Sequence, residues 1–333
     1  MKKLLKGKTI LITGGTGFLG ITLTREILKQ NPQSIRLFSR DEVKHHRIQE
    51  LFSHHPKIRN FIGDVRDYPR LLKATRNVDI VIHAAALKRI DLLEYNVEEA
   101  IKTNIIGTQN VVNVCLTNGV EKAIFISTDK ACSPVNTYGA CKFVGERIFS
   151  ESNFSKGDIR TIFTTVRYGN VLESTGSVIP FFNSKIKNGN KIPLTDSRMT
   201  RFIISPEQAV DLIFSAIKYG EGGEIFVPKL SSFKIVDLID ILKEKHKAKN
   251  KIKIIGIRPG EKIHELLINK TEIPRTVSFK NLYIITSCID NHKPLYLRAG
   301  KKINEALIKN YNSKDYLLTK IEIKKLFKQL ELI

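Results

Sequence analysis

The feature that most constrains the fold of this chain is a glycine-rich turn that directly follows a short apolar run. Residues 8–13 read Lys-Thr-Ile-Leu-Ile-Thr, a pattern typical of a strand that is buried on both faces. Three glycines then recur at intervals of three before a helical pattern begins. Glycine there allows a tight turn and brings a pyrophosphate close to the helix N-terminus. The turn predicts a dinucleotide site formed by Gly14, Thr16, Gly17, Phe18, Leu19 and Gly20.

Strand and helix patterns alternate along the first half of the chain. Further strands are predicted at 34–39, 58–62, 78–83, 123–127 and 161–167. Helical patterns lie between them, at about 41–53, 67–76, 97–118 and 138–152. Such alternation is typical of an α/β protein with a doubly wound parallel sheet of the Rossmann type.

The rhythm changes after residue 167, which suggests a second unit. Residues 169–201 are rich in Gly and Pro and predict loops, followed by a helix at 206–219 and a strand at 224–227. Beyond 231, helices are predicted near 234–247, 261–268 and 318–331, with strands near 252–255 and 282–285. We therefore expect residues 1–168, with a return segment at 202–230, to form the cofactor-binding domain. Residues 169–201 and 231–333 should form a smaller α/β substrate lobe.

Composition excludes several classes of function. The net charge is +22, but the basic residues are dispersed and lack interleaved aromatic residues, so we expect no nucleic-acid partner. No apolar run approaches about 20 residues, so we do not expect the chain to insert into a membrane. We expect a cytoplasmic location instead. The four cysteines lack metal-ligand spacing, and His264 and Glu265 lack the second His of a zinc motif. No metal site is predicted.

The end of the second predicted strand bears on the choice of cofactor. An NAD site commonly has a carboxylate there, whereas an Arg can pair with the extra phosphate of NADP. This chain has Ser39 and Arg40 at that point, so we predict NADP, with NAD the less favoured alternative. Other cofactor contacts are expected at the ends of the third and fourth strands and in the following helix, at Asp64, Val65, Ala84, Ala85, Ala86 and Asn104.

The chemistry of the site is indicated by Tyr138 and Lys142, which lie one helical turn apart. An ammonium beside a phenol favours the phenolate, so we expect Lys142 to lower the Tyr138 pKa. Such a Tyr can accept an alcohol proton while hydride leaves the adjacent carbon. Upstream, Asp129 and Lys130 follow Thr128 and add an acid and a base, more than simple alcohol oxidation requires.

Several sequence blocks together resemble the extended short-chain dehydrogenase/reductase superfamily and, within it, the inverting UDP-N-acetylglucosamine 4,6-dehydratases of bacterial glycan pathways such as that of pseudaminic acid. The blocks are 39–42, 61–67, 83–86, 127–136, 167–171, 199–201 and 256–265. Related retaining dehydratases carry Asp-Glu in place of Asp129-Lys130, and 4-epimerases generally lack both groups. The last ~60 residues carry no assignable motif.

The resemblance implies a mechanism and a set of substrate contacts. Tyr138 removes the sugar 4-hydroxyl proton with Thr128 beside it, and the cofactor is recycled. Lys130 is the candidate base for the C5 proton, a role that requires a depressed Lys130 pKa. Asp129 is the candidate acid for the departing 6-hydroxyl. Which of the two acts as the base stays open. A UDP-sugar is implied as substrate and a homo-oligomer, dimer or hexamer, as the assembly. The implied substrate contacts are Lys88, Tyr168, Asn170, Arg201, Arg258 and Glu261.

Three alternatives to this function stay open. Two are enzymes on the same fold, a nucleotide-sugar 4-epimerase and a retaining 4,6-dehydratase. The third is a non-catalytic NADP-sensing protein, which would need neither Tyr138 and Lys142 nor Asp129 and Lys130.

Overall fold

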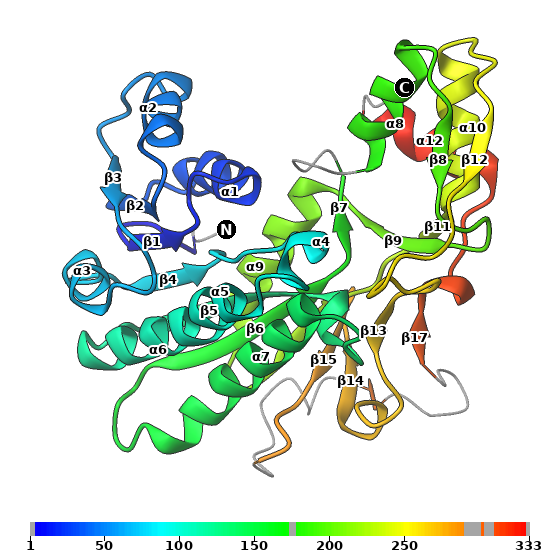
Figure 1. Cartoon of the computed structure of the whole chain (residues 1–333). Coiled ribbons are helices and arrows are strands. Elements are labelled where there is room, and N and C mark those ends of the chain that lie inside the picture. The colour runs from blue at the N-terminus through cyan, green and yellow to red at the C-terminus, as the bar shows by residue number, and fades with distance from the viewer. Residues whose placement is uncertain (1–3, 173–177, 290–300, 303–309, 331–333) are drawn as a thin grey trace.

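A computed structural model describes residues 4–172, 178–289, 301–302 and 310–330 of the chain (Figure 1). Its centre is a ten-stranded sheet in the order β16-β14-β15-β10-β6-β5-β4-β1-β2-β3. From β3 to β10 the neighbouring strands are parallel, which confirms the predicted doubly wound sheet. These strands are β1 (Thr9–Thr13), β2 (Ser34–Ser39), β3 (Ile58–Ile62), β4 (Ile80–His83), β5 (Lys122–Thr128), β6 (Ile162–Tyr168) and β10 (Ile225–Pro228).

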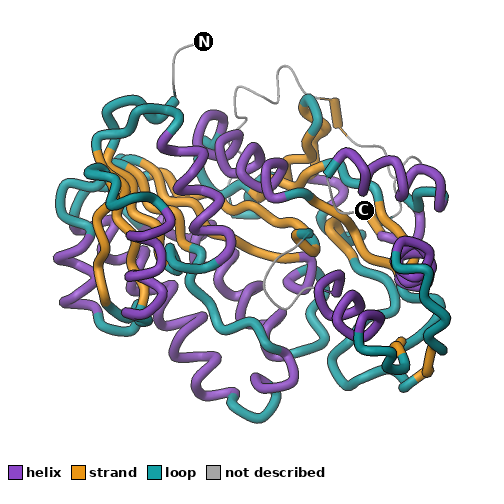
Figure 2. The backbone as a smooth tube through the Cα atoms, turned by 90° about the horizontal axis from the view of Figure 1, so that it is seen from above, coloured by secondary structure: helices purple, strands orange, loops and turns teal. Residues whose placement is uncertain are grey.

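Helices cover both faces of this sheet (Figure 2). Because successive side chains of a strand point to opposite faces, Ile10 and Ile12 face one layer and Leu11 faces the other. The first layer contains α1 (Phe18–Leu28), α2 (Glu42–Leu51) and α9 (Pro206–Tyr219). The second contains α3 (Tyr68–Ala74), α6 (Gly107–Thr117) and α7 (Thr137–Ser155).

The direction of winding reverses between β1 and β4, which are neighbours although β2 and β3 lie between them in sequence. In doubly wound sheets, ligands bind at such a reversal, outside the carboxyl ends of the strands. The glycine-rich turn follows β1, and Ala84 to Ala86 follow β4, so both segments lie at this edge. Two short helices, α4 (Ile90–Leu93) and α5 (Val97–Ile101), follow them in the chain.

A second unit has its own apolar core, at the right in Figure 1. That core is formed by α8 (Val178–Lys187), α10 (Ile235–Lys245) and α12 (Lys320–Gln329), which pack with β8 (Ile192–Leu194). β8 pairs with β12 (Ile252–Ile254), and β9 (Thr200–Ile204) lies between β7 (Asn170–Val171) and β11 (Ser232–Lys234). β13 (Leu266–Ile268) pairs with β17 (Tyr311–Asn312).

The structure differs from the sequence expectations in two segments. No helix spans 261–268; the segment instead ends in β13, because Leu266 and Ile268 pair with β17 across more than 40 residues of chain. The apolar spacing of Ile263, Leu266 and Leu267 imitated a helix, and the distant strand overrides it. The region predicted as loops at 169–201 contains α8, β8 and the start of β9.

The C-terminal region also contributes to the main sheet. β14 (Thr276–Phe279), β15 (Leu282–Ile285) and β16 (Lys301–Lys302) extend it antiparallel beyond β10. Part of the segment 231–333 that we expected in the substrate lobe therefore belongs to the central layer. In the described ranges, no helix is both long and apolar enough to cross a bilayer, and no cluster of side chains suited to a metal ion is found.

Candidate active site

The glycine-rich turn has the geometry that a pyrophosphate site requires. Gly14 has φ +70°, and a Cβ there would lie 2.8 Å from the Ala85 backbone nitrogen. A Cβ on Gly20 would lie 2.2 Å from the Gly15 carbonyl oxygen, so α1 packs directly against the turn. Helix α1 starts after Gly17, which makes no side-chain capping bond. The N-terminus of α1, which is the positive end of the helix dipole, thus carries no capping side chain at the place where an anion would bind.

A buried histidine ties the turn to the end of β4. The Thr13 hydroxyl lies 2.7 Å from His83 Nδ1, and His83 Nε2 lies 3.0 Å from the Thr108 hydroxyl. Thr13 also accepts a hydrogen bond from the Ala85 backbone. Burial, with repulsion from Lys142, lowers the His83 pKa to about 3, so the ring is neutral at physiological pH. This network fixes the backbone on both sides of the winding reversal.

The predicted cofactor-selecting residues lie together at the end of β2. The Ser39 hydroxyl is 2.8 Å from the Thr16 hydroxyl, and the Arg40 side chain is half exposed. Arg40 Nη1 lies 3.7 Å from Asp64 Oδ2. Asp41, which follows, caps α2 by accepting a hydrogen bond from a backbone N–H. The end of β2 therefore presents a half-exposed guanidinium that is also in a long ion pair with Asp64.

Asp64 and the segment after it are held by other contacts. Burial opposes ionisation of Asp64, but three hydrogen bonds from Arg66 lower its pKa. Val65 is buried and fills the space beside Gly107. Asn104 is buried in a π-helical turn, Lys102–Ile106, and exchanges two hydrogen bonds with the backbone of Leu87. It therefore fixes the strand-end loop, a role that its position in a predicted helix did not indicate.

The catalytic candidates converge where β5 meets α7. Strand β5 ends at Thr128, and Asp129 and Lys130 form a 3₁₀ turn directly after it. The Thr128 hydroxyl donates to Asp129 Oδ1 at 2.8 Å, and Lys130 Nζ donates to the same oxygen at 3.0 Å. Tyr138 lies in the first turn of α7 and interacts electrostatically with both members of the pair.

Lys142 behaves differently from the sequence expectation. Its Nζ donates to the Ile126 carbonyl at 2.7 Å and lies 4.4 Å from the centre of the Phe125 ring. Burial lowers the Lys142 pKa to about 7, although Glu146 opposes that shift. Burial also raises the Tyr138 pKa to about 12, and the cation that counteracts this is Lys130. The expectation that Lys142 lowers the Tyr138 pKa is therefore wrong for this structure.

The expected depression of the Lys130 pKa is also wrong. Burial opposes the charged amine, but attraction to Asp129 and to Glu265 outweighs that cost and raises the pKa of Lys130. The second carboxylate, that of Glu265, was not expected from the sequence. Glu265 lies 135 residues away in the chain, so no local pattern could show that it meets Lys130.

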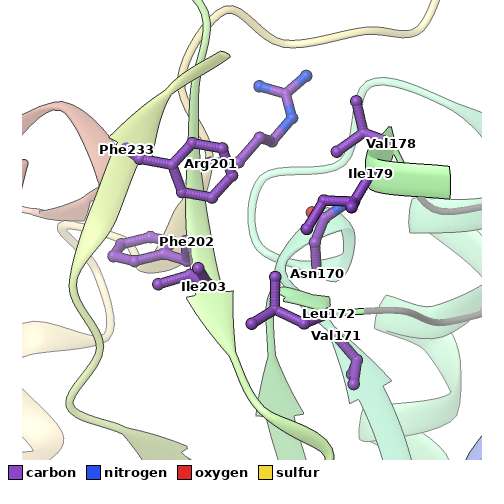
Figure 3. A pocket seen from close by; sticks show the side chains of 9 residues that line it. All are labelled: Asn170, Val171, Leu172, Val178, Ile179, Arg201, Phe202, Ile203 and Phe233. Carbon is purple, nitrogen blue, oxygen red and sulfur yellow. The ribbon is translucent and has the colours of Figure 1, made fainter. Parts of the chain in front are cut away.

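Two of the predicted substrate contacts line one pocket. Asn170 and Arg201 lie there with apolar side chains from β7, α8 and β9 (Figure 3). The lining residues are Asn170, Val171, Leu172, Val178, Ile179, Arg201, Phe202, Ile203 and Phe233. The pocket is mainly apolar, and its one guanidinium, that of Arg201, donates to the Thr200 carbonyl at 2.8 Å and to the Ile263 carbonyl at 3.2 Å.

The other predicted substrate contacts lie in different surroundings. Tyr168 is buried at the end of β6 and interacts electrostatically with Tyr138. Lys88 and Arg258 are exposed. The turn that leads from Arg258 to Glu261 contacts the start of α7, where Gly260 accepts a hydrogen bond from Asn136 at 2.7 Å. The sequence block 256–265 thus contacts the N-terminus of α7, the helix that carries Tyr138.

A buried ion network beneath the site was missed by the sequence analysis. Arg167 donates two hydrogen bonds to Glu146 and two to Glu272, and a fifth to the Leu267 carbonyl. Glu146 also accepts from Ser127, the residue before Thr128. The network joins β6, α7 and the C-terminal region directly below the catalytic turn.

Comparison with known proteins identifies close relatives. A family model described as polysaccharide biosynthesis protein matches residues 10–287. Over 285 residues the chain is 50% identical to a UDP-N-acetylglucosamine 4,6-dehydratase (inverting) of Campylobacter jejuni, covering 85% of this chain and 84% of the relative. It is 40% identical over 315 residues to a UDP-glucose 4-epimerase of Rickettsia bellii, covering 92% and 91%. Both likenesses span most of the two chains.

A solved structure agrees with these likenesses. The X-ray structure of Pen from Bacillus thuringiensis is similar with a TM-score of 0.92 at 38% identity, and the match covers 99% of both chains. The resemblance to the inverting dehydratases that the sequence motifs indicated is thereby confirmed.

Proposed function

This chain belongs to the polysaccharide biosynthesis protein family, and from that premise we propose that it is an NADP-dependent, inverting UDP-N-acetylglucosamine 4,6-dehydratase. The observation that carries the proposal is the Asp129–Lys130 pair beside Tyr138. Oxidation of an alcohol needs a proton acceptor such as Tyr138. Removal of water across C5 and C6 needs a second acid and base, which this pair supplies.

The side chains divide the reaction between them. NADP, which the glycine-rich turn and Arg40 would hold, would supply the hydride acceptor for oxidation at C4 and the hydride donor for reduction at C6. Tyr138 must be a phenolate to take the proton of the 4-hydroxyl, so its pKa, which burial raises here, must fall in the complex with substrate and cofactor. Thr128 orients the 4-oxygen. The resulting 4-ketone acidifies the C5 proton. Asp129 and Lys130 then remove that proton and protonate the departing 6-oxygen, and reprotonation of C5 from the opposite face gives inversion.

The raised Lys130 pKa keeps the amine protonated, whereas a base must be neutral. The hydrogen bond between Lys130 and Asp129 offers a way to form the neutral amine. Transfer of one proton along this 3.0 Å contact converts the ion pair into a neutral amine and a carboxylic acid. That one step provides both the C5 base and the acid for the 6-oxygen. Lys130 can therefore act as the base while the net charge of the pair stays constant.

The surroundings of β2 support NADP over NAD as the cofactor. Arg40 presents a half-exposed guanidinium there, and the Asp41 carboxylate is occupied in capping α2. Arg40→Ala should reduce the preference for NADP(H) over NAD(H). An unchanged preference would refute this assignment.

The pocket of Figure 3 supports a role for Asn170 and Arg201 in binding the nucleotide sugar. Arg258 and Glu261 are proposed to contact the nucleotide, and Lys88 and Tyr168 the sugar. The product would be UDP-2-acetamido-2,6-dideoxy-L-arabino-hexos-4-ulose for a bacterial surface glycan, with the pseudaminic-acid pathway as one destination. A homo-oligomer in the cytoplasm stays a prediction.

Product analysis in deuterated water tests the function directly. The protein is incubated with UDP-N-acetylglucosamine and NADP, and the product is followed by NMR. Dehydration predicts loss of the 6-hydroxyl, deuterium at C5, inverted C5 and no net consumption of cofactor. The 40% identity to an epimerase keeps 4-epimerisation as the second candidate, and it would leave the 6-hydroxyl in place without C5 exchange.

A lysine variant tests the acid–base pair. Lys130→Ala should bind NADP(H) normally but lose C5 exchange. Lys73→Ala, which removes an exposed lysine of α3, is the matched control. Normal turnover of Lys130→Ala would contradict the proposed mechanism.

A further inference from the structure

Glu265 is a buried carboxylate at the site for which the sequence analysis found no role. It precedes β13, and its side chain is only 3% exposed. Its backbone is fixed by two hydrogen bonds with Ser313: the Glu265 N–H donates to the Ser313 hydroxyl, and the Glu265 carbonyl accepts from the Ser313 N–H. A buried charge is unfavourable unless other charges compensate it, so its neighbours indicate what it does.

The carboxylate of Glu265 connects two cationic side chains. Its Oε1 lies 3.9 Å from Lys130 Nζ and 3.5 Å from Arg201 Nε. Lys130 Nζ also donates to Asp129 at 3.0 Å, so the amine stands between two carboxylates. Arg201 belongs to the pocket of Figure 3, and Glu265 therefore joins that pocket to the acid–base pair.

The carboxylates of this cluster have oxygens without hydrogen-bond partners in the described part of the chain, which distinguishes the cluster from a purely structural ion network. Asp129 Oδ2 and Glu265 Oε2 are both buried, and neither has a hydrogen-bond partner among the described residues. In the Arg167 network, by contrast, all four oxygens of Glu146 and Glu272 accept hydrogen bonds. Unsatisfied buried acceptors in a native protein call for an explanation. Here they lie on the two carboxylates that flank a reactive amine.

Charges from several elements act on this cluster. Lys130 faces Asp129 and Glu265, and it interacts with Arg201 from β9, with Lys88 beyond β4 and with Tyr138 on α7. Glu265 in turn is influenced by Lys262. Burial and the nearby Asp129 raise the pKa of Glu265, whereas the cations oppose that shift. Removal of the Glu265 charge would leave Asp129 as the carboxylate beside Lys130.

We propose that Glu265 is a positioning residue that holds the Lys130 amine between two carboxylates and links it to Arg201. This inference rests on the proposed dehydratase function and assigns a further residue to the same site. The charge of Glu265 keeps the proton shared by Lys130 and Asp129 on the amine. Without the negative charge of Glu265, the shared proton is held less strongly on Lys130. The neutral Lys130 amine, which accepts the C5 proton, then forms more readily.

Glu265→Gln tests the proposal, because it keeps the size of the side chain and removes its charge. The Lys130 amine is followed by NMR of protein labelled at lysine ¹³Cε, with Lys130→Arg identifying its signal. Loss of the ammonium signal should begin at lower pH in Glu265→Gln, by on the order of one unit. The pH profile of C5 exchange should move in the same direction. An unshifted Lys130 signal in folded Glu265→Gln would overturn the proposal, whether or not the protein dehydrates the sugar.

Two further variants separate positioning from folding. Glu265→Asp keeps the charge on a shorter arm and should retain the parental pH profile with a reduced kcat. Asp315→Asn removes an exposed carboxylate two residues from Ser313 and should change neither readout. If Glu265→Gln unfolds while Glu265→Asp folds with the parental profile, the charge is required and the proposal stands. If both unfold, Glu265 serves the fold and the proposal fails. A parent protein that forms no dehydrated product would instead refute the proposed function.

Discussion

Replacement of Arg167 by Met should destabilise the protein strongly. The Arg167 side chain is fully buried between Glu146 and Glu272, each of which receives two of its hydrogen bonds. Met approximates the length of the side chain without its charge. The substitution therefore leaves two buried carboxylates without the cation that compensates them.

The size of the effect follows from these contacts. Removal of one partner from a buried ion pair typically costs about 3–5 kcal/mol. Because one guanidinium here serves two carboxylates, we expect a loss near the upper end, about 5 kcal/mol in the free energy of unfolding. With a urea m-value of roughly 3 kcal/mol/M or more, the midpoint should fall by about 1–2 M.

The loss should depend on pH in a defined direction. Burial opposes ionisation of Glu272, but Arg167 outweighs it and holds the Glu272 pKa below its usual range. A carboxyl with a lowered pKa contributes stability above its unfolded pKa of about 4.3, and that stability is lost as pH falls through the folded pKa. In Arg167→Met burial favours protonation instead. The difference in the free energy of unfolding between Arg167→Met and the parent should therefore be smaller at pH 5 than at pH 7.5.

Urea unfolding followed by circular dichroism at pH 7.5 and pH 5 measures both effects. Arg160→Met, at an exposed position, is the matched control and should leave the midpoint unchanged. Equal midpoints for Arg167→Met and the parent would refute the reasoning. A difference that grows as the pH falls would refute its electrostatic part.

Three further predictions follow from local geometry. Gly20→Ala should abolish NADP(H) binding in a fluorescence titration, because its Cβ would lie 2.2 Å from Gly15 O; binding within twofold of the parent would contradict this. At pH 8 a thiol reagent should modify Cys288 alone, since the other cysteines are buried and burial raises the Cys132 pKa to about 12; two rapidly reacting thiols by mass spectrometry would oppose it. His83→Asn should lower the thermal midpoint by several degrees, as measured by calorimetry, because it removes a buried link between two strands; an unchanged midpoint would show that the link is dispensable.

Local patterns were sufficient for much of the cofactor-binding half. Continuous apolar strands and the spacing of Gly14, Gly17 and Gly20 depend on neighbours in sequence, so they predicted β1, the turn and α1 correctly. The proximity of Asp129, Lys130 and Tyr138 was predictable for the same reason. They lie at the end of one strand and the start of the next helix.

Long-range contacts account for what the sequence did not reveal. Glu265 directly precedes β13, which pairs with the distant β17, and it lies 3.9 Å from Lys130; neither long-range contact has a local signature. Attraction to Glu265 helps to raise the Lys130 pKa, so the lowered Lys130 pKa expected from the sequence was wrong. The Lys142 amine similarly bonds to a carbonyl of β5, which its helical spacing from Tyr138 could not indicate.

Glu265 and the outer helices α8, α10 and α12 lie against different apolar cores of the described residues. Leu267 and Ile268, next to Glu265, pack in the same core as β5 and β6, whereas α8, α10 and α12 pack in the other. Strand β9 belongs to both, with Phe202 in the first core and Ile203 in the second. Substitutions within α8, α10 and α12 should therefore leave the packing beside Glu265 largely unchanged.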